Sequence, residues 1–421
     1  PTELTEFLLN DTVKGAIPAI QEYIHWLARN GQNYFEFNLL ESINRKTWIS
    51  HAQKFVKYAK ERGIYCGVDL SLHMLQQKAF QLYQTPPKTL KKADTQLIEN
   101  AQWLAQAGFD LWNVELSSTE FTAGNQEKKS RLLALLQNFT KSNGIQLMSR
   151  VHVVKPSEMV GKNKDSEYQQ LNKQHGLMVH TVMFYSLTDK IAPVYRNKNL
   201  HHLYDLLKSQ KNKREIWYYP ETAYWVTFDN SVPLFLLPYL SARLSDIETC
   251  EKERIQGHLT FSSGWEWGYW LFDWSVARWC WTISRNEIPE LKRPAQYAEQ
   301  LIQNPRFRRY FERELQTQQT YIKDKQLIRV LDAQTVTDEI PGKLNLEFHP
   351  RPVYSYKHIR NKAGLYELDQ VKKAYLLPLQ ELITKNQEAD KIIADETLNS
   401  IETELFQSIK ITHLRANHRF H

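Results

Sequence analysis

Two short segments of the 421-residue chain place glutamates where they could act on a substrate. The first reads NVELSSTEF and holds Glu115 and Glu120, and the second reads YYPETAYW and holds Glu221. Two carboxyl groups facing one substrate can cleave a glycosidic bond when burial or a neighbouring charge keeps one protonated and the other stays ionised. A separation of about 5 Å would indicate a retaining mechanism, and roughly 6.5–9.5 Å an inverting one. Alternatively, either glutamate forms an ion pair with Arg150 or another basic residue, because buried carboxylates need partners.

Aromatic side chains accompany both the second glutamate and a later segment. Flat aromatic faces stack on sugar rings, and the 12% aromatic content, with 12 Trp and 21 Tyr, exceeds what core packing usually uses, which indicates either a ligand surface or a large aromatic-rich core. The later segment reads SSGWEWGYW, and its glycines allow tight turns. We interpret it as a sugar-stacking floor whose glutamate binds hydroxyl groups; the alternative is an aromatic plug packed beneath C-terminal helices. The residues concerned are Tyr224, Trp225, Trp265, Glu266 and Trp267.

Two histidines, His152 and His180, fall near the ends of predicted strands. Together with Asp69 and the glutamates they could bind a divalent metal, but no HxH or HExxH spacing supports that reading. A histidine in such a position more often forms hydrogen bonds, here to hydroxyls or to a catalytic carboxylate. The sequence also lacks a G-x-S-x-G motif, a Gly-rich phosphate loop and a cysteine in a mouth loop. We therefore expect no metal and no cofactor.

The elements that must position these residues alternate between amphipathic helices and short strands, with Gly or Asn breaks between them. Such alternation indicates a parallel sheet, and so many successive units favour a closed (β/α)8 barrel of the TIM type. Seven strands are visible, so the first strand is either upstream and missing or atypical. The predicted helices are 16–29, 48–61, 95–107, 128–142 and 199–209, and the predicted strands are 34–39, 65–72, 111–116, 146–153, 177–184, 215–219 and 258–262.

Side chains within each predicted strand alternate between an apolar face and a polar face. Phe35 and Phe37 oppose Glu36, for example, and Val68 and Leu70 oppose Asp69. The apolar faces suit a surrounding layer of helices. The polar faces gather toward the carboxyl ends of the strands, which in a barrel form the catalytic mouth. An antiparallel sheet with one wet face would share this alternation, but the intervening helices argue against it.

The length suits a barrel with one further region. We place the barrel at residues 1–285 and a mainly helical region at 286–421, including predicted helices at 294–315 and 369–406. The net charge of +7 comes from charges of both signs spread along the chain, with no nucleic-acid-binding motif, so we expect no nucleic-acid partner. Three cysteines form no disulfide framework, and no segment has the ~20 apolar residues of a membrane span. We expect a soluble protein, and the start at Pro1 is compatible with export after removal of an N-terminal segment. The oligomeric state is left open.

With these residues and this order of elements, the segment from about residue 16 to 281 resembles the TIM-barrel glycoside hydrolases. Glu115, in the sequence NVE, is similar to the acid/base glutamate that the large retaining clan carries at the end of strand four, and Glu221 is similar to its nucleophile at the end of strand seven. Trp265 is similar to the tryptophan that often forms a sugar platform after strand eight. The sequence departs from the clan because Asn113 is not adjacent to Glu115, and it lacks the Asp-Glu pair that hexosaminidases use.

The resemblance implies a glycosidase acting on carbohydrate, with Glu115 or Glu120 as general acid/base and Glu221 as nucleophile or second carboxylate. Two other hypotheses stay open: a metal-dependent barrel hydrolase or isomerase that uses His152, His180 and carboxylates, and a non-catalytic carbohydrate-binding barrel. We predict that the substrate contacts Asp69, His73, Asn113, Arg150, His152, His180, Tyr219, Tyr224, Trp225, Trp265, Glu266 and Trp267.

Overall fold

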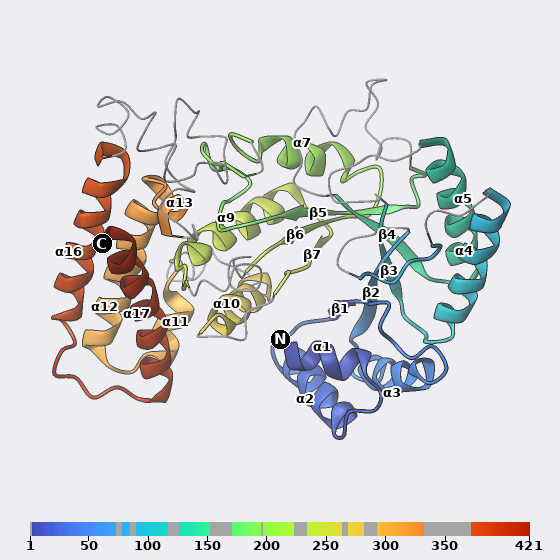
Figure 1. Cartoon of the computed structure of the whole chain (residues 1–421), viewed down its shortest axis with the longest axis horizontal. Helices are drawn as coiled ribbons and strands as arrows, with labels where there is room; N and C mark the ends of the chain where they lie inside the picture. The colour runs from blue at the N-terminus through green and yellow to red at the C-terminus, as the bar shows by residue number, and fades with distance from the viewer. Residues whose placement is uncertain are drawn as a thin grey trace. The chain divides into compact units, whose positions relative to one another are not determined.

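A computed structural model describes residues 2–72, 78–84, 90–116, 126–151, 171–194, 197–222, 234–262, 268–281, 293–331 and 372–421. Its central feature is a curled, half-barrel sheet of seven parallel strands that follow one another in chain order (Figure 1). The strands are β1 (Tyr34–Asn38), β2 (Tyr65–Ser71), β3 (Leu111–Glu115), β4 (Gln146–Val151), β5 (Gly176–Thr181), β6 (Ile216–Pro220) and β7 (Gly257–His258). The predicted α/β fold with a parallel sheet is confirmed.

The curl of the sheet brings strands together that are not neighbours in it. The ring of Tyr34 in β1 meets the ring of Trp217 in β6 edge to face, with ring centroids 5.1 Å apart. Four strands separate β1 from β6 in the sheet order, so this contact requires the inner face to be concave. Side chains from distant parts of the sequence therefore meet on that inner face.

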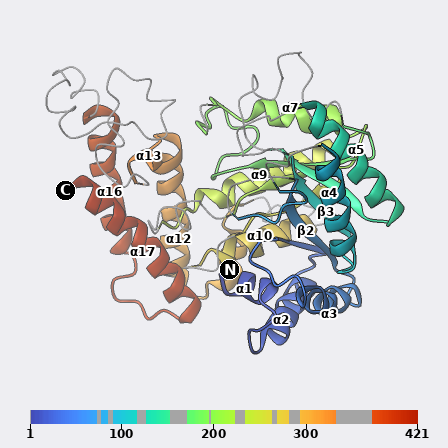
Figure 2. The same cartoon turned by 45° about the vertical axis from the view of Figure 1, so that its right-hand side comes forward.

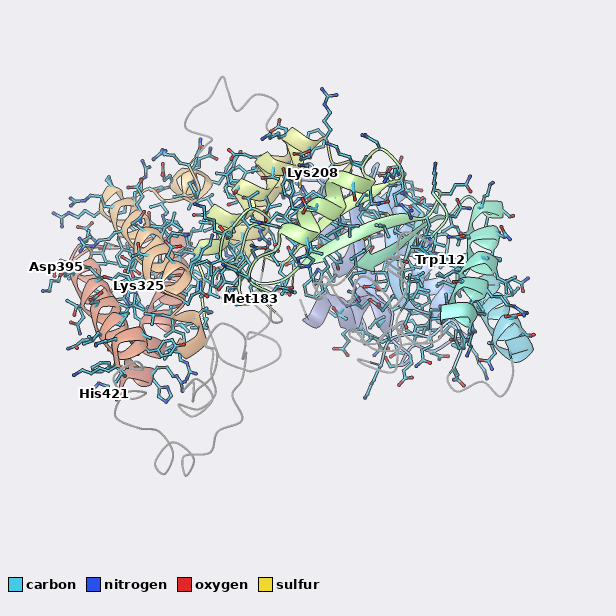
Figure 3. The ribbon with its side chains drawn as sticks, turned by 90° about the horizontal axis from the view of Figure 1, so that it is seen from above. Trp112, Met183, Lys208, Lys325, Asp395 and His421 are labelled. Carbon is cyan, nitrogen blue, oxygen red and sulfur yellow. The ribbon has the colours of Figure 1, made fainter. Side chains whose placement is uncertain are left out.

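The alternation of side chains explains the layered packing. Phe35, Phe37, Val68 and Leu70 are buried on the outer face. In β3 the outward Trp112 stacks on Phe139 with ring centroids 6.0 Å apart, so it packs against helix α5 (Figure 3). The helices that alternate with strands β1 to β6 or precede them are α1 (Thr2–Leu9), α2 (Ala16–Arg29), α3 (Trp48–Lys60), α4 (Leu90–Ala105), α5 (Gln126–Ser142) and α7 (His201–Gln210).

The breaks predicted between helices and strands also occur. Helix α2 ends with Asn30 as its C-cap, and Gly31 follows with a φ of 70°, a conformation that glycine adopts at no steric cost. Figure 2 shows α2 beside α3 and α4 beside α5, as expected for helices that cover one face of successive strands.

The last strand differs from its prediction. β7 covers only Gly257–His258, and the register pairs Trp217 with Gly257. Because paired residues of neighbouring parallel strands point to the same side, Leu259 shares the inner face with Tyr219. The alternation in the predicted strand 258–262 puts the apolar Leu259 on the face expected to pack against helices, and the register shows that this expectation is wrong for Leu259. The glycine explains the register, since a Cβ at position 257 would overlap the Trp217 ring.

The chain forms two compact units. The first consists of Pro1–His180, Asp205–Tyr219 and Arg254–Leu259, and the second of Thr181–Tyr204, Pro220–Glu253 and Thr260–His421. The described C-terminal residues are helical, as predicted, while the boundary at residue 285 stays a prediction. Elements of the second unit are α9 (Pro238–Glu253), α10 (Trp270–Trp281), α11 (Gln296–Leu301), α12 (Pro305–Gln318), η3 (Gln319–Asp324), α13 (Ile328–Leu331), η5 (Lys372–Leu376), α16 (Leu377–Asp390) and α17 (Ser400–Phe420).

Two C-terminal helices are shorter than their sequence patterns suggest. Asn304 ends one run and caps α12, where its side chain accepts hydrogen bonds from two backbone N–H groups and Pro305 occupies the first turn. Asn399 forms a capping box with Glu402 and so begins α17. Capping residues thus divide the predicted 294–315 and 369–406 helices. Among the described residues, no helix combines the length and the hydrophobicity needed to cross a bilayer.

Candidate active site

The inner face of the first unit carries a cluster of polar residues from neighbouring strands. The register pairs Asn38 with Asp69 and Asp69 with Asn113, and it pairs Ser71 with Glu115 one step nearer the carboxyl ends. Arg150 lies near the end of β4 with the same parity. Parallel pairing therefore places these side chains on one concave surface, as predicted from their alternation.

Arg150 joins two of the carboxylates. Its Nη1 lies 2.9 Å from Oδ2 of Asp69, and its Nε lies 3.5 Å from Oε2 of Glu115. Arg150, Asp69 and Glu115 are only 8%, 5% and 3% exposed. A guanidinium at these distances favours the ionised form of both carboxyl groups, because a buried negative charge requires a compensating partner. The anticipated alternative, an ion pair between Glu115 and Arg150, is therefore present.

A third carboxyl group, Glu36 of β1, belongs to the same cluster. The hydroxyl of Tyr34 donates to Oε2 of Glu36 over 2.6 Å, and Nδ2 of Asn113 donates to Oε1 over 2.9 Å. Burial, followed by the nearby charge of Asp69, raises the pKa of Glu36 to about 7. The sequence reading placed Glu36 on the polar face but did not include it among the site residues. Its alternation with Tyr34 and Asn38 was the signal that could have identified it.

Tyr219 and His180 extend the cluster across β5 and β6. Nδ1 of His180 lies 2.8 Å from the carbonyl oxygen of Tyr219, so the Nδ1–H donates, and the two rings are 4.9 Å apart. Tyr219 shares a side-chain hydrogen bond with Arg150. Burial and the charge of Glu36 raise the pKa of Tyr219 well above its ordinary value, although Arg150 opposes them. The hydroxyl is therefore neutral at physiological pH and remains a hydrogen-bonding group.

Glu221 lies in the second unit, one residue beyond the end of β6. It is 3% exposed, and its Oε2 accepts the backbone N–H of Met183 over 2.8 Å. Met183, labelled in Figure 3, has a φ of 64°, in the left-handed region that non-glycine residues rarely adopt. That conformation presents the Met183 N–H to the carboxylate. The pairing of Glu115 with Glu221 stays a prediction.

A buried ion pair holds the backbone around Glu221. Arg243 on α9 donates from Nη1 to the carbonyl oxygen of Glu221 over 2.7 Å and from Nη2 to that of Tyr185 over 2.6 Å. Its Nη2 also lies 3.0 Å from Oδ2 of Asp246, and both side chains are fully buried. Arg243 therefore fixes the two segments between which the Glu221 carboxylate is held.

A second carboxyl group of this unit has a supporting role. Asp273 in the first turn of α10 accepts hydrogen bonds from the hydroxyls of Thr222 and Ser262. Burial raises the pKa of Asp273 to about 6, against the effect of those two hydroxyls. Asp273 therefore ties the start of α10 to the segments that follow β6 and β7.

Eight predicted site residues lie outside the described residues. They are His73, Glu120, His152, Tyr224, Trp225, Trp265, Glu266 and Trp267. The choice between Glu115 and Glu120 and the aromatic floor therefore stay predictions. Within the described ranges, no three His, Cys, Asp or Glu side chains are grouped so that they could hold a metal ion.

Comparison with known proteins places the fold. No family model matches the chain, and no curated protein does. Among solved structures, it resembles a GH138 enzyme targeting pectin rhamnogalacturonan II, with a TM-score of 0.58 and 11% identity over 96% of this chain. The chain covers 53% of that enzyme, about half its length. Two further structures are more distant. For an O-GlcNAc hydrolase mutant from Thermobaculum terrenum the TM-score is 0.46 at 10% identity, and the match covers 96% of this chain and 79% of that one. For CpGH84B the TM-score is 0.45 at 12% identity, and the match covers 96% of this chain and 71% of that one. At this identity the first likeness shows the fold alone.

Proposed function

We propose that this protein hydrolyses glycosidic bonds, with carboxyl groups at the carboxyl ends of its strands acting on a carbohydrate. The observation that carries the proposal is the buried Asp69–Arg150–Glu115 arrangement on the concave face of a barrel-type sheet. Active sites of such sheets lie at the carboxyl ends of the strands. The likeness to a GH138 enzyme supports the fold in which this chemistry would occur.

The contacts suggest how the roles divide. Arg150 favours the ionised form of Glu115, which suits a base or a nucleophile in the free enzyme better than an acid. The proton donor would then be Glu221 or Glu120, and either choice leaves one protonated and one ionised carboxyl group, as glycoside hydrolysis requires. Asp69, Asn113 and Tyr219 would bind hydroxyl groups of the sugar, since each offers a polar atom to the concave face.

The test compares variants of the two glutamates on a panel of aryl glycosides and pectin-derived oligosaccharides. Glu115→Gln and Glu221→Gln keep the side-chain shape but lose the charge and the titratable proton, so each should lower kcat by at least about 100-fold. Glu22→Gln, on the exposed side of α2, is the matched control and should leave kcat unchanged. Thermal unfolding midpoints report whether each variant folds.

Near-normal turnover in both site variants would end this proposal. A folded wild-type protein that binds a panel sugar without hydrolysing it would instead favour the non-catalytic carbohydrate-binding barrel. Dialysis against a chelator, followed by assay, addresses the metal-dependent alternative, because a metal enzyme would lose turnover and recover it on adding back a divalent ion.

A further inference from the structure

We propose that Glu36 is a positioning residue of the inner-face cluster, which consists of Glu36, Asp69, Glu115 and Arg150. Glu36 holds a proton, and in this neutral form it leaves Arg150 paired with Asp69 and Glu115. The inference rests on the proposed function, because it concerns the same site. It adds a residue on β1 that neither the sequence pattern nor the resemblance to glycoside hydrolases assigns a role.

The cluster carries more negative than positive groups. Among the described residues, the cluster holds three carboxyl groups and one guanidinium. Arg150 lies within ion-pair distance of Asp69 and Glu115, whereas the hydrogen bonds of Glu36 come from the neutral Tyr34 hydroxyl and Asn113 amide. These two hydrogen bonds and the charge of Arg150 lower the pKa of Glu36, but bonds from neutral donors stabilise an ionised carboxyl group less than a guanidinium at ion-pair distance does. A proton is therefore retained most easily on Glu36.

The neighbours of Glu36 hold its side chain in place. A Cβ at Gly67 would overlap the Tyr34 hydroxyl, so the glycine provides the space from which that hydroxyl reaches Glu36. The charged groups that act on both Glu36 and Tyr219 are Asp69 on β2 and Arg150 on β4, and Glu36 also acts on Tyr219 of β6. Glu115 on β3 contacts Arg150, and His180 on β5 lies against Tyr219.

Glu36 also has access to solvent. Tyr34 and Glu36 are mostly buried but keep part of their surface open to solvent, and Asn38 is exposed, whereas Phe35 and Phe37 on the other face of β1 are buried. A proton on Glu36 can therefore exchange with water. The pKa of about 7, set mainly by burial and then by Asp69, places that exchange in the physiological range.

Loss of the proton has a structural consequence. Ionised Glu36 adds a negative charge beside Asp69 and competes for the guanidinium of Arg150, which loosens its contact with Glu115. Turnover should then fall on the alkaline side of about pH 7. Glu36→Gln, which has the shape of the protonated acid at every pH, should remove that fall.

The experiment measures the protonation of Glu36 and the environment of the Arg150 side chain by spectroscopy, without an assay of activity. Infrared spectra of the full chain, labelled with ¹³C in its glutamate carboxyls, should show a protonated-acid band that disappears with a midpoint near pH 7. Glu36→Gln should lose this band, and Glu41→Gln, the exposed control that follows β1, should keep it. The ¹⁵Nε resonance of Arg150 should shift over the same pH range in the wild type and in Glu41→Gln but not in Glu36→Gln.

Two results would overturn the inference: a band unchanged by Glu36→Gln, or an Arg150 resonance that shifts equally in that variant. A band and an Arg150 shift that both depend on Glu36, in a protein that hydrolyses no glycoside, would refute the proposed function while supporting the proton-holding role. Where hydrolysis is found, the alkaline limb of the kcat profile should move by at least about one pH unit in Glu36→Gln.

Discussion

Replacing Arg150 with methionine tests how much its buried ion pairs contribute to the free energy of unfolding. Methionine keeps much of the length of the side chain but leaves Asp69 and Glu115 without the guanidinium that lies 2.9 Å and 3.5 Å from them. Removing one partner of a buried ion pair typically costs about 3–5 kcal/mol, because the remaining charge is left uncompensated.

Protonation of the abandoned carboxylates limits that cost. Neutralising an ordinary carboxyl group with a pKa of about 4 requires roughly 4 kcal/mol at pH 7 but only about 1–2 kcal/mol at pH 5, at about 1.4 kcal/mol per pH unit. We therefore expect Arg150→Met to lower the free energy of unfolding by about 3–4 kcal/mol at pH 7 and by less than half of that at pH 5. Asp69→Asn combined with Arg150→Met should recover part of the loss at pH 7.

The assay is urea unfolding followed by both circular dichroism and tryptophan fluorescence, whose transitions should coincide. Arg306→Met is the control, because Arg306 contacts Glu396 at 2.7 Å but its side chain is 66% exposed. That variant should cost no more than about 1 kcal/mol. A loss for Arg150→Met that is as small as the control, or that does not shrink on acidification, would refute the reasoning.

Two further predictions concern packing and pH. Gly67→Ala should lower the free energy of unfolding by about 1–3 kcal/mol, because the added methyl group displaces the Tyr34 hydroxyl from Glu36; a thermal midpoint equal to that of the wild type would contradict this. In the helical region, burial lowers the pKa of His413, but hydrogen bonds to Asp390 and to Glu314, at 2.9 Å, outweigh it and raise the pKa overall. A raised pKa means that the contribution of His413 is fully present below about pH 6.5 and is lost as pH rises through the folded-state value. His413→Gln should therefore cost about 3 kcal/mol near pH 6 and less near pH 9, and a loss independent of pH in urea unfolding would contradict the charge-based explanation.

Local signals were enough to predict much of the fold. The alternation of Phe35 and Phe37 with Glu36 assigned the faces of β1 correctly, because the helix layer buries one side of each strand. Asn30 followed by Gly31 ended the first predicted helix at the observed residue. The predicted strand at 215–219 nearly coincides with β6, which ends at Pro220.

Features that depend on distant partners were not predictable. Glu36 acquires its raised pKa from burial on the concave face and then from Asp69, and the sequence does not reveal how strongly the sheet curls. β5 was expected to run to residue 184 but ends at Thr181, because Met183 turns into the left-handed region that its type seldom adopts. The Arg243 anchor beneath Glu221 likewise comes from a helix that no pattern connected with the site.

The interleaving of the two compact units bears on how the protein can be cut and recombined. Each unit is assembled from three stretches of chain, so the polypeptide passes from one to the other five times. Thr412 on the last helix exchanges hydrogen bonds with the backbone of Phe235, and Gln318 accepts the N–H of Leu237. A fragment trimmed after residue 285 would leave both backbone segments with unsatisfied groups. Truncated or fused versions of the protein should therefore retain the C-terminal helices, which are part of the unit that contains Glu221.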